Sequence, residues 1–252
     1  MLDAGSSHVC GITLDDRAFC WGNQFRGKLG NGQRNGSTPQ PVAVSGERAF
    51  TAVWASAGSS CALTSDGDAY CWGANDYGML GDGEAPEPFK ESTTPVRVVG
   101  GHRFASLGLV GNHACGITLD GRAYCWGWNP YGQLGDGTTA HSSSPVPVAG
   151  NHRWAVLAIG SAHNCGLTID GAAYCWGNND RGQFGNGGTS GAISPELIAA
   201  PGTYVAIIAG YNHTCALTDA GTAYCWGQGD YGQLGDGVFA DRLRPTQVAA
   251  YE

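Results

Sequence analysis

The chain has few charged residues and, among these, few basic ones. Only 13% of its 252 residues are charged, and 21 acidic residues against 13 Lys and Arg give a formal net charge of −8. Proteins that bind nucleic acid need clustered Lys and Arg to contact the phosphates. A nucleic-acid partner is therefore not expected, and the expected partner is another protein or an extracellular ligand.

Long hydrophobic runs and catalytic motifs are also missing. No apolar stretch approaches the ~20 residues of a transmembrane helix, so no membrane span is predicted. The chain begins MLDAGSSHVC, which lacks the basic and apolar segments of a signal peptide. We find no G-x-S-x-G, no H-E-x-x-H and no P-loop, so no catalytic residue is assigned, and the question of enzyme activity stays open.

Cysteine, in contrast, is plentiful and regularly spaced. The ten cysteines fall into five pairs with the spacing C-x9-C, and each pair ends in Cys-Trp-Gly. This period of about 50 residues indicates five similar units in one domain, 1–252. The approximate repeats are 1–49, 50–103, 104–153, 154–203 and 204–252. The pairs are Cys10/Cys20, Cys61/Cys71, Cys115/Cys125, Cys165/Cys175 and Cys215/Cys225.

Each cysteine pair encloses a predicted β-hairpin. In four repeats the midpoint is followed by the turn glycine, Gly67, Gly121, Gly171 or Gly221, whereas the first repeat has Asp15-Asp16 and should form a less regular turn. Directly opposed residues have Cβ atoms ~4.5–5.5 Å apart, near the distance that a disulfide needs. We predict five intra-repeat disulfides, with zinc binding and free thiols as the alternatives. Paired cysteines indicate an oxidising, secreted or otherwise extracytoplasmic location.

A glycine-rich loop follows each Cys-Trp-Gly. In the third repeat it reads Asn129-Pro-Tyr-Gly-Gln-Leu-Gly-Asp-Gly137, and a proline-containing strand such as Pro95-Val-Arg-Val-Val completes the repeat. Each repeat thus supplies about four short strands, the content of one propeller blade. The predicted fold is an all-β propeller of five four-stranded blades.

The consensus His-x-Cys-x-Leu-Thr-x-Asp-Gly-x-Ala-Tyr-Cys-Trp-Gly, followed by the glycine-rich loop, resembles the regulator of chromosome condensation repeat over essentially the whole chain. The resemblance implies a β-propeller with one blade per repeat, usually seven in number. The cysteine-paired form looks like secreted bacterial members of that family. Its nuclear members are nucleotide exchange factors for a small GTPase and bind chromatin, but this acidic chain lacks the basic surface for that role.

An aromatic residue stands eleven positions before the first cysteine in repeats two to five, at Phe50, Phe104, Trp154 and Tyr204. Counting back from Cys10 through the C-terminus reaches Tyr251, so the two ends are in phase. We therefore predict that Pro245–Tyr251 completes the blade begun at Leu2 and closes the ring by pairing the N- and C-terminal segments. An open piece of a longer array is the alternative.

Two recurring positions suggest metal sites, but each has a simpler role. The position two before the first cysteine carries His8, Ser59, His113, His163 and His213, which would suit a transition metal. A repeated histidine more often satisfies a backbone group. The Asp and Asn residues of the Leu-Gly-[Asp/Asn]-Gly turns are ordinary turn formers rather than a calcium loop. No cofactor is predicted.

Positions that depart from the repeat are the best candidates for binding. Trp54 and Trp128 replace smaller or polar residues at their repeat positions, and the long loop Glu84–Thr94 contains Phe89. We predict contact roles for Trp54, Trp128, Phe89 and Tyr211.

Three functions are consistent with these features. The first is a secreted, disulfide-stabilised scaffold that binds another protein, as secreted β-lactamase inhibitors of the resembled family do. The second is an extracellular hydrolase with its site at the mouth of the propeller channel. The third is a structural module of a larger surface protein or filament. Oligomeric state is not predicted.

Overall fold

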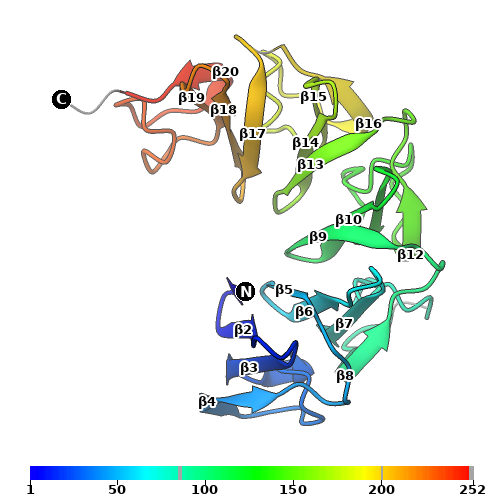
Figure 1. Cartoon of the computed structure of the whole chain (residues 1–252). Coiled ribbons are helices and arrows are strands. Elements are labelled where there is room, and N and C mark those ends of the chain that lie inside the picture. Colours follow the sequence, from blue (N-terminus) through cyan, green and yellow to red (C-terminus); the bar gives the residue numbers. More distant parts are fainter. Residues whose placement is uncertain (85–86, 200, 250–252) are drawn as a thin grey trace. The chain divides into compact units, whose positions relative to one another are not determined.

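The computed structural model describes residues 1–84, 87–199 and 201–249, and strands dominate its architecture. In these residues twenty strands form five antiparallel sheets of four, and each sheet is built from one repeat (Figure 1). A short 3-10 helix, η1 (Phe25–Gly27), lies in the first glycine-rich loop. The all-β class and the four-stranded blade are confirmed.

The strands follow one another along the chain in the same order in every sheet. The first sheet contains β1 (Leu2–Ala4), β2 (His8–Ile12), β3 (Ala18–Asn23) and β4 (Ser37–Ala43). The second contains β5 (Ala52–Ala55), β6 (Ser59–Leu63), β7 (Ala69–Ala74) and β8 (Glu91–Arg97). The third contains β9 (Phe104–Val110), β10 (His113–Thr118), β11 (Ala123–Gly127) and β12 (Ser142–Pro147). The fourth contains β13 (Trp154–Ile159), β14 (His163–Thr168), β15 (Ala173–Gly177) and β16 (Ala192–Leu197). The fifth contains β17 (Tyr204–Ala209), β18 (His213–Thr218), β19 (Ala223–Gly227) and β20 (Arg242–Gln247).

The chain divides into two compact units, which are described separately. Unit 1 comprises Met1–Leu119, Tyr124–Trp128 and His141–Val146, and unit 2 comprises Asp120–Ala123, Asn129–Ala140 and Pro147–Glu252. The first two sheets lie in unit 1, and the fourth and fifth lie in unit 2. That 1–252 forms a single domain stays a prediction.

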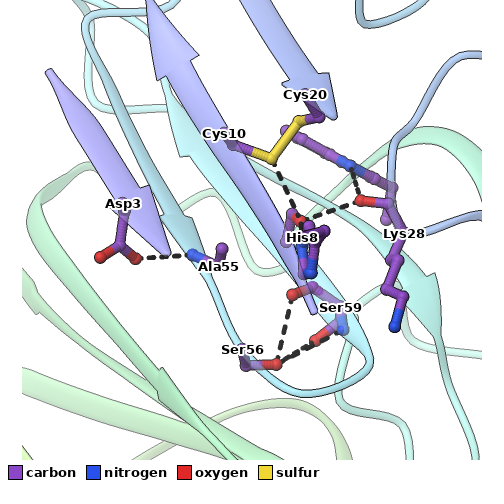
Figure 2. The surroundings of a disulfide bond; sticks show 10 residues. Asp3, His8, Cys10, Cys20, Lys28, Ala55, Ser56 and Ser59 are labelled. Carbon is purple, nitrogen blue, oxygen red and sulfur yellow. Dashed lines mark hydrogen bonds between the residues drawn. A yellow bond between two sulfur atoms is a disulfide. The ribbon is translucent and has the colours of Figure 1, made fainter. Parts of the chain in front are cut away.

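One disulfide joins the two central strands of each sheet, which makes five in all. The pairing is the predicted one, with Cys10 directly opposite Cys20 in the ladder and Cα atoms 4.1 Å apart (Figure 2). The other four bridges, Cys61–Cys71, Cys115–Cys125, Cys165–Cys175 and Cys215–Cys225, have Cα separations of 4.0–4.1 Å. No cysteine is free among the described residues. Each sheet is thus covalently joined at its centre.

The hairpin turns between the paired cysteines share one conformation. Gly67, Gly121, Gly171 and Gly221 have φ near +80°, the left-handed region that glycine enters without steric cost. In the first repeat Asp16 takes this position with φ +60°, and its N–H donates to the carbonyl of Thr13 as the glycine N–H of Gly67 does to Thr64. The expectation of a less regular first turn was therefore wrong, since Asp tolerates the left-handed region.

Inside each unit, neighbouring sheets pack face to face through a buried tryptophan. One cluster joins the first and second sheets through Trp72, a second joins the second and third through Trp126, and a third joins the fourth and fifth through Trp226. In each case the face that carries the disulfide of one sheet receives the tryptophan face of the next. The core is therefore a series of junctions between sheets, as expected for propeller blades.

Each terminal strand pairs within the sheet of its own repeat. Pro245 lies in β20, which pairs with β19 of the fifth sheet, and β1 pairs with β2 of the first sheet. Leu2–Ala4 provides the first strand of its own blade, with Asp3 opposite Cys10, and closure of the ring by the terminal segments stays a prediction. Tyr251 lies outside the described residues.

Candidate functional site

An open cleft of about 520 Å³ lies in unit 1 and has a mainly aromatic lining. Its residues come from three segments that connect strands, because the strands themselves are used for packing between sheets. Asp76 and Tyr77 belong to the glycine-rich loop after β7, Pro88 and Phe89 to the long loop before β8, and His141 directly precedes β12.

Tyr77 makes two aromatic contacts at this cleft. The Tyr77 ring meets His141 edge-on at a centroid separation of 5.2 Å, and the half-buried Trp128 lies 6.3 Å from Tyr77. Phe89 is 77% exposed on the same cleft. Of the predicted contact residues, Phe89 lines the cleft together with Tyr77, and Trp128 packs near the Tyr77 ring. We call Tyr77, Phe89, Trp128 and His141 the aromatic cluster.

A group of ion pairs orders the loop that carries Phe89. Asp76 accepts the Phe89 N–H at 2.7 Å and a guanidinium N–H of Arg26 at 2.9 Å. Arg26 also lies 3.5 Å from a carboxylate oxygen of Glu91 and donates to the carbonyl of Lys90. The hydrogen bond from Arg26 holds the pKa of Asp76 below its usual value, and the same bond raises the pKa of Arg26. These contacts hold Phe89 at a φ of +61°, a strained value for this residue.

In other repeats too, the side chain at the position equivalent to Tyr77 contacts the following repeat. Arg26, at the equivalent position of the first repeat, pairs with Asp76 and Glu91. Arg181, in the fourth repeat, lies 3.6 Å from Asp230 and 3.2 Å from Asp241. In the second repeat Tyr77 and His141 put an aromatic contact where those repeats have ion pairs. The aromatic cluster is therefore a local change to a recurring contact between blades.

The other two predicted contact residues lie elsewhere. Trp54 is half-buried in β5, opposite Cys61, and packs against the core cluster between the second and third sheets. It is therefore a packing residue, and its prediction as an exposed anchor is corrected, because the disulfide face of the second sheet is covered. Tyr211 is 73% exposed in unit 2, and its carbonyl accepts the Ser161 hydroxyl at 2.6 Å. Its contact role stays a prediction.

Two of the recurring histidines, His8 and His163, bond to hydroxyl groups of the next sheet within a unit. Nε2 of His8 lies 2.7 Å from the Ser60 hydroxyl, which donates to the carbonyl of Lys28 at 3.0 Å (Figure 2). His163 has the same relation to Thr214, at 3.1 Å. Burial, and secondarily the charge of Lys28, lowers the pKa of His8 to about 4, so its imidazole is neutral at physiological pH. These bonds assign His8 and His163 a structural role.

Figure 2 also shows how the first sheet is fixed to the second near this histidine. The Asp3 carboxylate accepts the N–H of Ala55 at 2.7 Å, and the Ser56 and Ser59 hydroxyls lie 3.1 Å apart. The loop glycine Gly5 is required here, because an added Cβ would lie 2.0 Å from the Ser56 carbonyl oxygen. The Asp3–Ala55 contact and the close approach of Gly5 to Ser56 belong to the junction between sheets, whereas the Ser56–Ser59 contact lies within the turn between β5 and β6.

No group of three or more potential metal ligands occurs in the described part of the chain. Among the same residues no helix is long and apolar enough to span a membrane. The absence of a cofactor stays a prediction.

Sequence reasoning missed Tyr77 and His141. Tyr77 was hidden because the same loop position carries Tyr131 and Tyr231 in other repeats. His141 lies in the variable stretch after the glycine-rich loop, where the repeats cannot be aligned with one another from the preceding motif. An alignment on the following strand would have identified it, since Ser37, Glu91, Gly191 and Asp241 occupy its position.

Comparison with known proteins identifies the family. The model for the RCC1-like domain matches residues 1–252. The chain belongs to the RCC1-like domain family. The ultraviolet-B receptor UVR8 of Arabidopsis thaliana is 32% identical to it over 139 residues, which are 54% of this chain and 31% of the receptor. The chain thus matches less than a third of the length of that RCC1-like relative.

Solved structures of RCC1-like proteins have the same fold. Human WBSCR16 superposes with a TM-score of 0.84 at 22% identity, covering 99% of this chain and 66% of that one. Prp20p of Saccharomyces cerevisiae superposes with a TM-score of 0.60 at 20% identity, covering 99% of this chain and 76% of that one. At these identities the likeness establishes the propeller fold alone.

Proposed function

We propose that this RCC1-like chain is a secreted, disulfide-stabilised scaffold that binds a protein partner through the aromatic cluster. The observation that carries the proposal is the open cleft lined by Tyr77, Phe89 and His141, with Trp128 behind Tyr77. Aromatic residues are enriched among the few side chains that dominate the energy of protein interfaces. The ion pairs of Arg26 hold this surface in place before binding, which reduces the entropy lost on association.

Both a related protein and the net charge of this chain favour a protein partner. The structure of the relative Prp20p is described together with its binding to Gsp1p and histones. The net charge of −8 makes an acidic partner such as nucleic acid unfavourable for the present chain. A protein segment with apolar side chains would fill the cleft and contact the Phe89 ring.

The extracytoplasmic location rests on the five disulfides. Structural disulfides persist in oxidising compartments and are rare in the cytosol. Alkylation of the protein as it is isolated from its source, followed by mass measurement, should detect no free thiol. Several alkylated cysteines would place the protein in a reducing compartment.

The hydrolase alternative gains no support from the cleft. Asp76 is the carboxylate among the described lining residues, and it pairs with Arg26. The lowered pKa of Asp76 keeps it ionised, so it is unsuited to act as a general acid.

The test begins with capture of the partner from the native medium on the immobilised chain and its identification by mass spectrometry. Calorimetry with the purified partner then compares Phe89→Ala and Trp128→Ala with the control Tyr231→Ala, which removes an exposed tyrosine of the fifth repeat. We expect binding at least ~10-fold weaker for the two cleft variants and unchanged for the control. Equal affinities, or turnover of an ester or glycoside by the wild-type chain, would overturn the proposal.

A further inference from the structure

At two junctions an arginine joins a hairpin turn to the connection that leads into the next sheet. Arg103, directly before β9, donates to the carbonyl of Asp66 at 3.4 Å and lies 2.8 Å from the Asp68 carboxylate. Arg153, directly before β13, donates to the carbonyl of Asp120 at 2.6 Å and lies 3.3 Å from its carboxylate. A turn carbonyl and a nearby carboxylate thus form a recurring acceptor site for a guanidinium group.

The junction between the first and second sheets has the same turn but no arginine. The carbonyl of Asp16 accepts the N–H of Phe50 at 2.8 Å, the bond that the equivalent residues make at the other two junctions. Ala49 occupies the position of the arginine. No described residue donates to the carbonyl of Asp15, which is equivalent to the carbonyls that accept the two arginines. An acceptor site for a guanidinium group is therefore present without its arginine.

A pocket of about 390 Å³ lies at this place in unit 1. One wall is formed by residues 15–18, at the turn between β2 and β3, and the other by residues 43, 44 and 46–50, at the end of β4 and in the connection to β5. The volume falls in the range of ~300–1,000 Å³ that is usual for small-ligand sites. Both walls belong to one junction, so the pocket is formed by the first and second repeats alone.

Three carboxylates line this pocket, and none of them forms an ion pair among the described residues. They belong to Asp15, Asp16 and Glu47, all of which are exposed. Asp16 has a φ of +60°, at the position where the other hairpins carry glycine. A side chain that is kept at a strained backbone position points to a function for that side chain.

The two arginines of the lining are directed to aromatic rings. The Arg48 guanidinium lies over Tyr70 at 3.9 Å, the stacking position that His102 takes in the next connection, and Arg17 lies over Phe19 at 5.1 Å. Cation–π contacts of this kind account for both guanidinium groups. The carboxylates and the turn carbonyl remain as acceptors for a cation from another molecule.

We propose that this pocket binds an arginine side chain of a protein partner. The guanidinium would donate to the Asp15 carbonyl and contact the Asp16 carboxylate, as Arg153 contacts the carbonyl and carboxylate of Asp120. Arginine is favoured over lysine because its planar group presents several N–H donors in a fixed fork. The net charge of −8 also favours a cationic segment. The pocket lies at the hairpin-turn end of the strands and the aromatic cluster at the other end, so this inference is independent of the proposed function.

NMR titration of the isotope-labelled chain with three peptides tests the proposal. The peptides are acetylated and amidated Gly-Gly-X-Gly-Gly, in which X is arginine, lysine or citrulline. The arginine peptide should shift the amide signals of residues 15–17 and 47–49. It should bind at least ~10-fold more tightly than the citrulline peptide, which has the same shape without the charge, and several-fold more tightly than the lysine peptide. Equal binding of the arginine peptide and either control peptide, or shifts confined to other residues, would overturn the proposal.

Filling the pocket from within gives the decisive comparison. Ala49→Arg places an arginine where Arg103 and Arg153 stand at the other junctions, and it should weaken binding of the arginine peptide at least ~10-fold. Thr203→Arg is the matched control, because Thr203 has the same repeat position between the fourth and fifth sheets, and it should bind like wild type. Asp16→Gly restores the usual turn glycine and removes a carboxylate, so it should fold and bind several-fold more weakly. Wild-type affinity in either pocket variant would refute the assignment.

Discussion

Trp54 and Trp128 both depart from the repeat, yet they have different surroundings. Trp54 lies opposite a disulfide cysteine on a sheet face that the third sheet covers, and it is half-buried against the core. Trp128 follows β11 at the point where the strand gives way to a loop, and its ring is near Tyr77 at the cleft. The location of a tryptophan, on a covered strand face or in a loop at the cleft, rather than its rarity in the repeat, determines its role.

We expect Trp54→Ala to lower the free energy of unfolding by about 2–3 kcal/mol, because it empties part of a packed junction. Partner affinity should change little, since Trp54 does not line the cleft. Urea denaturation checks the first expectation and calorimetry the second. An unchanged urea midpoint together with weaker partner binding would show that Trp54 belongs to the binding surface.

His8 should make stability depend on pH. Its pKa is about 4 in the folded chain and 6.5 when unperturbed, so the unfolded state takes up the proton first as pH falls. Stability contributed by neutral His8 is therefore full above about pH 6.5 and is lost between about pH 6.5 and pH 4. The loss should reach at most about 3 kcal/mol.

His8→Gln provides the comparison, because the amide can still donate to the Ser60 hydroxyl. Urea denaturation of both proteins between pH 7 and pH 4 should show a shallower fall for the variant. Burial also lowers the pKa of His213, and this residue is kept in both proteins, so its effect cancels in the difference. Parallel curves would refute the assignment to His8.

At the scale of the element, the sequence predicted the hairpins and their disulfides well. The turn glycines and the C-x9-C spacing are local signals, and they place each cysteine directly opposite its partner. The long loop before β8 was not predictable in this way. Its order depends on Arg26, which lies 50 residues before Asp76 in the chain. Arginine occupies this loop position only in the first and fourth repeats, at Arg26 and Arg181, so the contact is not visible in the repeat consensus.

Arg26→Ala should release this loop without unfolding the sheets. The variant removes the guanidinium that joins Asp76, Glu91 and the Lys90 carbonyl. Trypsin should then cleave after Lys90 at least several-fold faster than in the wild type, because cleavage follows the population of the opened loop. Arg181→Ala removes the corresponding pairs in the fourth repeat and should leave this rate unchanged. Equal rates for all three proteins would show that the loop is ordered by other contacts.

At the scale of the whole molecule, the repeat predicted five four-stranded sheets and the family. It did not predict the partners of the terminal segments. Counting residues from one end to the other shows that the chain holds an integer number of repeats. Any such chain has its two ends in phase, so the count does not show which strands pair. The pairing of β20 with β19 is decided by ladder contacts inside the last repeat. The aromatic cluster likewise needed the structure, because its residues come from two repeats.

Hydrogen exchange of the complex with its captured partner tests the central claim most directly. If the aromatic cluster is the binding surface, amides of residues 87–91 and 140–142 should gain protection on binding, since their segments carry Phe89 and His141. Segments around Tyr211 and Tyr231, exposed aromatics outside the cluster, should exchange as in the free chain. Protection confined to those segments, with none at Phe89 or His141, would contradict the account.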